Sequence, residues 1–217
     1  DDSLDAADLS YFGALAQLVC DGLAACGFSR CPGNIMATNS TWCQPQHVWH
    51  DYFDRWITTW DPEALLNCSI FFDLTTVYGD TRLLNQVRRQ MLEKTHGNSL
   101  FLAHLSRNAL RLKPPLGFFR DFVLTERGDN QKVLDLKHNG IACIVDLARI
   151  YALSEGVDKV NTLERLRAVT GTQVLSRSSG QSLQDAYELL TQLRMQHQAS
   201  QLRLGQTPDH FLAPNSL

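Results

Sequence analysis

The sequence lacks the short motifs that mark many nucleotide-handling and hydrolytic enzymes. It contains no P-loop, no GxGxxG fingerprint, no GxSxG nucleophile elbow and no HExxH zinc motif. These absences exclude P-loop phosphotransferases, dinucleotide-binding dehydrogenases, esterases of the α/β-hydrolase type and zinc proteases that carry HExxH. We therefore assign no catalytic residue and no metal ligand from the sequence alone.

The chain also lacks a large excess of either positive or negative charge, and it has no long apolar run. Its net charge is -3 without a long basic stretch, which argues against a dedicated nucleic-acid binder. No run approaches the ~20 apolar residues that span a bilayer, so we expect no membrane segment. The first residues are acidic and do not resemble a secretory signal. Six cysteines occur without a CxxC pair, which favours a reducing, cytoplasmic location.

What is present is a succession of helical patterns with little strand. Asp61 followed by Pro62 is a typical helix start, and glycines follow several apolar periodic stretches. One short strand is conceivable at 34–38, a solvated turn at 126–132 and a loop at 171–181. The spacing predicts a mainly α fold, with helices at 8–26, 47–60, 61–78, 80–95, 99–112, 116–124, 141–153, 162–169 and 182–204.

The most informative segment is LDLKHNGIACIVDLARIYAL, residues 134–153. From Ile141 onward it is apolar on every side except at Asp146 and Arg149, so we expect a buried helix. Buried charges must pair or bind something. Asp146 and Arg149 could simply form an i,i+3 pair, or they could join Lys137 and His138, close to Asp135, in an anion pocket.

The last helix changes character halfway along its apolar face. Leu190 and Leu193 are succeeded on that face by Arg194, His197 and Gln201, with Gln198 beside them. Either the helix emerges into solvent there, or it lines a polar cavity that Arg165 could also join. In the second case, ionic side chains from two helices, with Lys137 and Arg194 among them, converge on one hollow that binds a negatively charged ligand.

Three other features have simpler interpretations. The aromatic stripe Trp49, Tyr52, Phe53, Trp56 and Trp60 is more typical of packing than of base stacking. His104 fits a core histidine, and Asp73 in FFDLTTVYGD is a lone carboxylate. Cysteines and histidines at 31, 43, 47 and 50 do not have a standard zinc spacing.

Several segments in order resemble a bacterial "putative nucleotidyltransferase" family. They are CPGNIMATNSTWCQP, NCSIFFDLTTVYGD, PPLGFFRDF, LDLKHNGIACIVDLARIYAL, NTLERL and LRMQHQ, and together they span about 11–212. The family is related to the protein-PII uridylyltransferase and the glutamine-synthetase adenylyltransferase. The resemblance implies a nucleotidyltransferase domain followed by a helical substrate-binding domain, often preceded by cyclic-nucleotide-binding or CBS regulatory domains.

By this resemblance, residues 1–79 are the back half of a small α/β nucleotidyltransferase domain and residues 80–217 the helical bundle domain. The family's glycine-serine loop and its T-D-x-D-type acidic pair, which holds Mg²⁺, do not occur in the sequence. We expect them upstream of Asp1, so that this chain alone is inactive. The complete protein would use Mg²⁺ and a nucleoside triphosphate to modify a protein or small-molecule acceptor in signal transduction. We expect no nucleic-acid or membrane partner. A homodimer is possible.

The resemblance also suggests roles for individual residues. Lys137, Gly140 and Asp146 align with a K-x-x-x-G-G-L-R-D stretch of the related transferases, without its double glycine and its arginine. Lys137 would neutralise phosphate charge, helped by Arg194 or Arg149, while Asp146 would orient Lys137 or Arg149. Thr75 stands where an arginine is expected. The alternative is a non-catalytic helical interaction module, recognisable by an exposed apolar patch such as the Trp49/Trp56 stripe.

Overall fold

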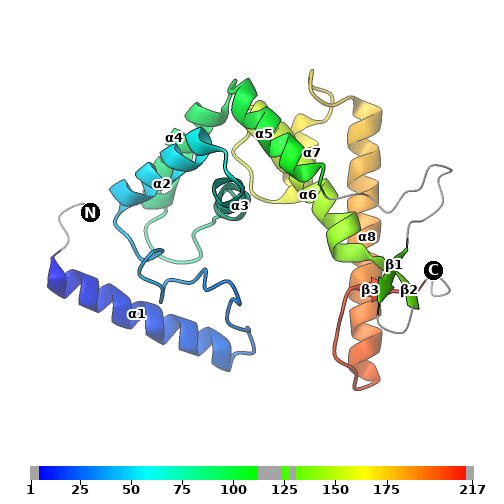
Figure 1. The fold of residues 1–217 in the computed structure, drawn as a ribbon, viewed down its shortest axis with the longest axis horizontal. Helices are drawn as coiled ribbons and strands as arrows, with labels where there is room; N and C mark the ends of the chain where they lie inside the picture. Colours follow the sequence, from blue (N-terminus) through cyan, green and yellow to red (C-terminus); the bar gives the residue numbers. More distant parts are fainter. Residues whose placement is uncertain (1–4, 112–123, 128–130, 214–217) are drawn as a thin grey trace.

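The computed structural model describes residues 5–111, 124–127 and 131–213 and confirms a mainly α fold (Figure 1). Within residues 5–79 it contains helices and no strand. The described α-helices are α1 Ala6–Ala25, α2 Gln46–Thr59, α3 Pro62–Phe71, α4 Thr81–Thr95, α5 Ser99–Ala109, α6 Ala142–Ser154, α7 Thr162–Val169 and α8 Arg177–Arg203. Much of the helical prediction is thereby confirmed, apart from the differences described below.

The main core lies among α2, α3, α4, α5 and α6 and is rich in aromatic rings. Trp56 is 2% exposed and stacks on Phe71 at 5.3 Å between ring centroids, while Trp42 lies 4.7 Å from the same ring. Stacked and edge-on ring pairs stabilise the fold beyond the contribution of the apolar area that they bury. The aromatic stripe of α2 is therefore packing, as expected, and it does not form an exposed patch.

This core also joins the two segments that the sequence analysis separates at residue 79. Phe53 and Phe72 on one side and Val87 and Phe101 on the other are buried in the same cluster. A shared core does not test whether residue 79 divides two domains, so this boundary stays a prediction.

Side-chain caps explain where several helices begin. Asp61 accepts a hydrogen bond from the Ala64 amide at 2.8 Å, and Asp80 and Asn161 act in the same way before α4 and α7. Such caps satisfy amides that have no partner inside the helix, each contributing roughly 1 kcal/mol. The predicted start at Pro62 and the helix at 162–169 are confirmed.

Three predicted segments were wrong. The stretch 34–38 forms bends and turns instead of a strand. Helix α3 ends at Phe71 rather than Tyr78, because the Phe72 carbonyl accepts from Arg165 and the Leu74 carbonyl from Arg88. The loop predicted at 171–181 ends early, since Ser176 caps α8 by accepting from the Ser179 amide.

The turn predicted at 126–132 was wrong in part, because residues 126–127 and 131–132 lie in strands, while residues 128–130 lie outside the described residues. Strand β1, Thr125–Arg127, pairs antiparallel with β2, Gln131–Asp135, and β2 pairs with β3, Phe211–Leu212. Val133 and Leu134 are buried, and Leu134 clusters with Leu212 and Leu193 of α8. The predicted helix at 116–124 falls almost entirely outside the described residues.

A π-helix, η1 Leu136–Ile141, follows β2 and leads directly into α6. Six α6 residues are buried, which confirms the buried helix predicted from Ile141. Gly140 allows α8 to approach, because a Cβ at this position would lie 3.2 Å from Leu190 Cδ1.

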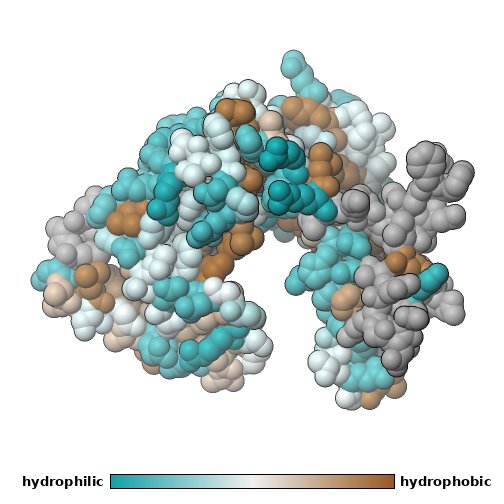
Figure 2. Space-filling model, viewed as in Figure 1, coloured by the Kyte–Doolittle hydropathy of each residue, from teal (hydrophilic) through white to brown (hydrophobic). Residues whose placement is uncertain are grey.

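The remaining helix, α1, has few buried side chains and exposes much of its apolar surface. It forms one limb of an arch in Figures 1 and 2, with α8 and the small sheet forming the other. Ala16 and Cys20 are its buried residues, whereas Leu18 is 71% exposed. Among the described residues, every helix falls short of the length or the apolar content needed to cross a bilayer.

Candidate functional site

Four charged side chains from three parts of the chain form an ion network around two buried arginines. Asp73 accepts two bonds from Arg149, at 2.6 and 3.3 Å, and one from Arg165 at 2.6 Å. Arg149 also donates to Asp146 at 2.6 Å. The two arginine side chains are only 6% and 3% exposed. The i,i+3 pair considered in the sequence is thus real, and Arg165 joins it through Asp73.

The guanidinium groups of the network donate hydrogen bonds to backbone carbonyls as well as to carboxylates. Arg165 donates to the Lys159 carbonyl at 2.6 Å and to the Phe72 carbonyl at 3.3 Å. Forked guanidinium groups can reach such partners simultaneously, which a lysine could not do. Asp73 therefore holds the loop after α3 against α6 and α7.

The pKa values of the arginines reflect their surroundings. Burial acts to lower the pKa of Arg149, but the carboxylates of Asp73 and Asp146 outweigh it and raise the pKa above its usual range. Burial lowers the pKa of Arg165, helped by the charges of Arg149 and Arg88, and Asp73 offsets this only in part. Nearby, burial raises the pKa of the Cys68 thiol to about 12, so it stays neutral.

A polar cavity of about 390 Å³ lies beside the network, where the loop after α3 meets α4 and the segment before α7. Arg88 lines it and also pairs with Asp158 at 3.4 Å. The lining combines hydroxyl, amide, cationic and acidic groups, namely Thr75, Thr76, Thr81, Asn85, Arg88, Asp158, Lys159 and Glu164. Its volume falls within the range of small-ligand pockets, roughly 300–1,000 Å³.

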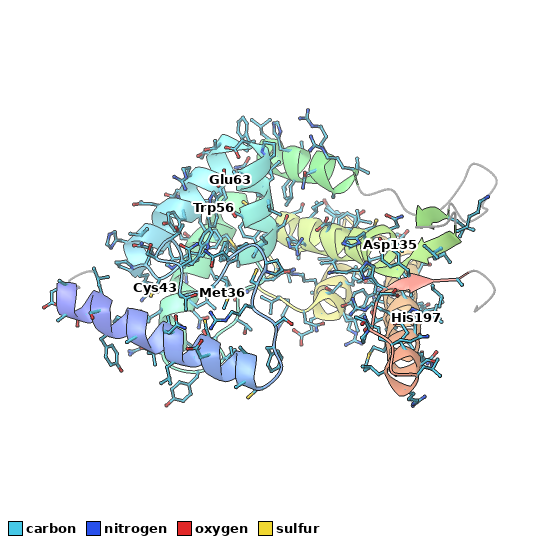
Figure 3. The ribbon with its side chains drawn as sticks, turned by 60° about the horizontal axis from the view of Figure 1, so that its bottom comes forward. Met36, Cys43, Trp56, Glu63, Asp135 and His197 are labelled. Atoms are coloured by element: carbon cyan, nitrogen blue, oxygen red, sulfur yellow. The ribbon has the colours of Figure 1, made fainter. Side chains whose placement is uncertain are left out.

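A second group of predicted residues lies at the other end of α6. Lys137 and His138 are exposed, and their amides donate to Asp135. His138 Nδ1 lies 2.9 Å from the Asp135 carboxylate. On α8, His197 Nε2 is 3.1 Å from Asp209, and Figure 3 shows Asp135 and His197 at this same end of the molecule.

Arg194 and Gln198 are half-buried and lie on either side of His197 in the sequence of α8. The Arg194 Nε atom is buried without a hydrogen-bond partner. The cavity of about 390 Å³ and another of about 280 Å³, at Arg55 and Trp56, are lined by neither Lys137 nor Arg194. A hollow shared by these two cations therefore stays a prediction.

Sequence reasoning missed the central position of Asp73 and the contribution of Arg88. Asp73 is separated by 76 residues from Arg149 and by 92 from Arg165, so spacing gives no indication of these pairs. A signal existed, because Asp73 directly follows the buried Phe71 and Phe72, and a carboxylate next to a core tends to pair with a cation. His104 stacks on Trp60 at 4.9 Å, in keeping with a packing role.

The described residues do not fit the Mg²⁺ that the resemblance implies. Phosphoryl-transfer metals need several converging carboxylates, yet Asp73 and Asp146 are both turned to arginines. Across residues 5–111, 124–127 and 131–213, the one group of three metal-ligating side chains that converge is Asp135, His138 and His210. The cysteine and histidine set at 31, 43, 47 and 50 does not converge in this way, and we derive no metal-assisted step.

These features define a helical domain with a polar cavity, an internal arginine–carboxylate network and a small sheet at one end. A family model described as "Putative nucleotidyltransferase substrate binding domain" matches residues 99–217, and a second, described as a "Putative nucleotidyltransferase", matches residues 1–63. The chain belongs to this nucleotidyltransferase family with a C-terminal substrate-binding domain. It shows no match to a curated protein or to a solved structure.

Proposed function

We propose that this chain is the substrate-binding portion of a nucleotidyltransferase and that the polar cavity beside the ion network holds a nucleoside triphosphate. The observation that carries this proposal is the cavity itself. Thr75 and Arg88 on one wall lie between the two matched ranges, and Lys159 on the other wall lies inside the substrate-binding range. A ligand there would contact the substrate-binding range and the segment that precedes it.

The lining suits a nucleotide in two ways. Lys159 can neutralise phosphate charge, and Arg88 can do so if it exchanges its partner Asp158 for the ligand. The cavity also reaches the first turns of α4 and α7, where helix dipoles favour anions. Asn85 can donate or accept hydrogen bonds at ribose hydroxyls, and the Glu164 carboxylate can accept them, which suits a nucleotide better than inorganic phosphate.

In the complete protein, the nucleotidyl group would pass to a protein or small-molecule acceptor. An acceptor hydroxyl would attack the α-phosphorus in line, and pyrophosphate would leave. Positioning and charge stabilisation supply most of the rate in such reactions. The described residues contribute binding and positioning only, so this chain by itself should not transfer nucleotides. Cyclic-nucleotide-binding or CBS domains elsewhere in the protein would regulate the reaction.

Lys159→Met tests the location of the triphosphate. We expect roughly tenfold weaker binding of ATP, GTP, CTP or UTP, whichever binds best, because one charge-assisted contact is lost. Isothermal titration calorimetry in EDTA measures this without Mg²⁺. The fold should persist, since Lys159 is exposed and only its carbonyl serves Arg165.

Lys137→Met is the matched control, because Lys137 is equally exposed but lies outside the cavity. It should leave triphosphate binding unchanged. If Lys137→Met weakens binding and Lys159→Met does not, the ligand binds at the other end of α6 and the proposed cavity is wrong. If the wild-type chain binds none of the four triphosphates, the binding proposal fails.

A helical interaction module is the second candidate function, and the apolar surface of α1 favours it. Its exposed residues are Leu9, Tyr11, Phe12, Leu15, Leu18, Val19 and Leu23. Surfaces of this kind often mark contacts with another polypeptide. A second copy of this chain is the simplest partner to test.

Light scattering after gel filtration, over a range of protein concentrations, measures that self-association. We expect dimers that Leu18→Glu abolishes, because the substitution places a charge in the apolar contact. Leu204→Glu, at an exposed leucine beyond α8, should leave the dimer unchanged. A wild-type chain that stays monomeric throughout would contradict this second function.

A further inference from the structure

A carboxylate and two histidines from three elements converge beside β2. Asp135 ends β2, His138 lies in η1 and His210 immediately precedes β3. One potential ligand atom from each residue lies within 4.8 Å of the others. The Asp135 carboxylate is 2.9 Å from His138 Nδ1 and 3.7 Å from His210 Nε2.

The backbone fixes this arrangement. Asp135 pairs with Phe211 across the sheet, and the Leu136 amide donates to the His210 carbonyl at 3.0 Å. Asp135 also caps η1, which brings His138, three residues later, back over the carboxylate. π-helical turns of this kind are often found at functional sites.

The hydrogen bonds within the cluster leave one ligand atom unused. His210 Nε2 is buried and has no hydrogen-bond partner, although it faces the Asp135 carboxylate. A buried imidazole nitrogen without a partner carries a desolvation penalty that a bound cation would remove. This atom is the strongest indication that the cluster accommodates a further group.

We propose that Asp135, His138 and His210 form a binding site for a divalent transition-metal ion such as Zn²⁺. Two imidazoles and one carboxylate are a common three-ligand set, with Zn–N and Zn–O distances of roughly 2.0–2.2 Å. Tetrahedral ligands at those distances lie roughly 3.4 Å apart, between the two separations seen here. The remaining coordination position is open to water or to an anionic oxygen.

The pKa shifts of His210 and Asp135 are in the direction that metal binding requires. Burial lowers the pKa of His210, the charges of His138 and Lys137 add to this, and the carboxylates of Asp135 and Asp209 offset it only in part. Burial acts to raise the pKa of Asp135, but hydrogen bonds from the His138 amide and ring outweigh it and lower the pKa. A neutral imidazole and an ionised carboxylate are the forms that ligate.

The test uses the full chain without an affinity tag, stripped with EDTA and then dialysed. Calorimetry with Zn²⁺ should show one site per chain, and Co²⁺ should give visible absorption bands of low-symmetry coordination. Loss of one ligand in His138→Gln or His210→Ala should weaken Zn²⁺ binding by roughly 10–100-fold or more. Circular dichroism checks that each variant folds, and His138→Gln alters a half-exposed side chain, so it should do so.

His96→Ala is the matched control, because His96 is an exposed histidine at the end of α4. It should bind Zn²⁺ as the wild type does. The proposal is overturned if the wild-type chain takes up no Zn²⁺ stoichiometrically, or if the folded His138→Gln and His210→Ala variants bind Zn²⁺ as tightly as His96→Ala. These results do not depend on triphosphate binding.

Discussion

Asp73→Ala should destabilise the protein by about 3–5 kcal/mol, because it removes the shared partner of two buried arginines. Arg149 would keep only Asp146, and Arg165 would keep only carbonyl acceptors. The desolvation penalty of the guanidinium groups would then be uncompensated. Urea denaturation followed by circular dichroism measures the free energy of unfolding.

Asp185→Ala provides the matched control for Asp73→Ala. Asp185 is an exposed carboxylate on α8 that accepts an i,i+4 hydrogen bond from Gln181 at 2.8 Å. Its loss should change stability by no more than about 0.5 kcal/mol. An Asp73→Ala variant as stable as Asp185→Ala would show that water screens the network and that it does not hold the helices together.

Gly180→Ala should cost about 3 kcal/mol, because α8 passes very close to the end of α7. A Cβ at Gly180 would overlap Thr170 Oγ1 and lie 2.8 Å from its Cγ2 atom. Thr170 cannot turn away freely, since its hydroxyl donates to the Leu166 carbonyl at 2.6 Å and accepts from Gln184 at 3.1 Å. Overpacking typically costs 1–3 kcal/mol, and a clash this severe belongs at the upper end.

The same substitution elsewhere separates the clash from helix propensity. Gly22 lies within α1, and a Cβ there would meet no atom within 4 Å. Gly22→Ala should therefore be neutral or stabilise the protein by up to about 1 kcal/mol. Thermal or urea unfolding of both variants gives the comparison. Equal stabilities would mean that α8 moves away from Thr170 at little cost.

Local patterns predicted the helices well because their causes are local. The caps at Asp61, Asp80 and Asn161 and the apolar spacing of α2 lie within a few residues of what they determine. The prediction failed where distant groups intervene. Arg165 and Arg88 bind the Phe72 and Leu74 carbonyls directly after α3, so the end of this helix depends on residues far away in the chain. The early start of α8 is different, because it follows from a local cap at Ser176 that the prediction missed.

The contacts of the candidate site also differ according to whether their partners are close together or far apart in the sequence. Asp146 and Arg149 are three residues apart, so their pair could be read from the sequence. The convergence of Asp73 with Arg165, or of His210 with Asp135, depends on how separate elements pack and pair. Sequence spacing contains no information on such contacts, and the polar cavity at Arg88 and Lys159 was missed for this reason.

A crystal structure of this chain soaked with the triphosphate that binds best tests the central claim most directly. We expect density for the triphosphate between Thr75, Arg88 and Lys159, with its phosphates within hydrogen-bonding distance of Lys159. Density beside Lys137 and Arg194 instead, with the cavity at Lys159 filled only by water, would contradict it.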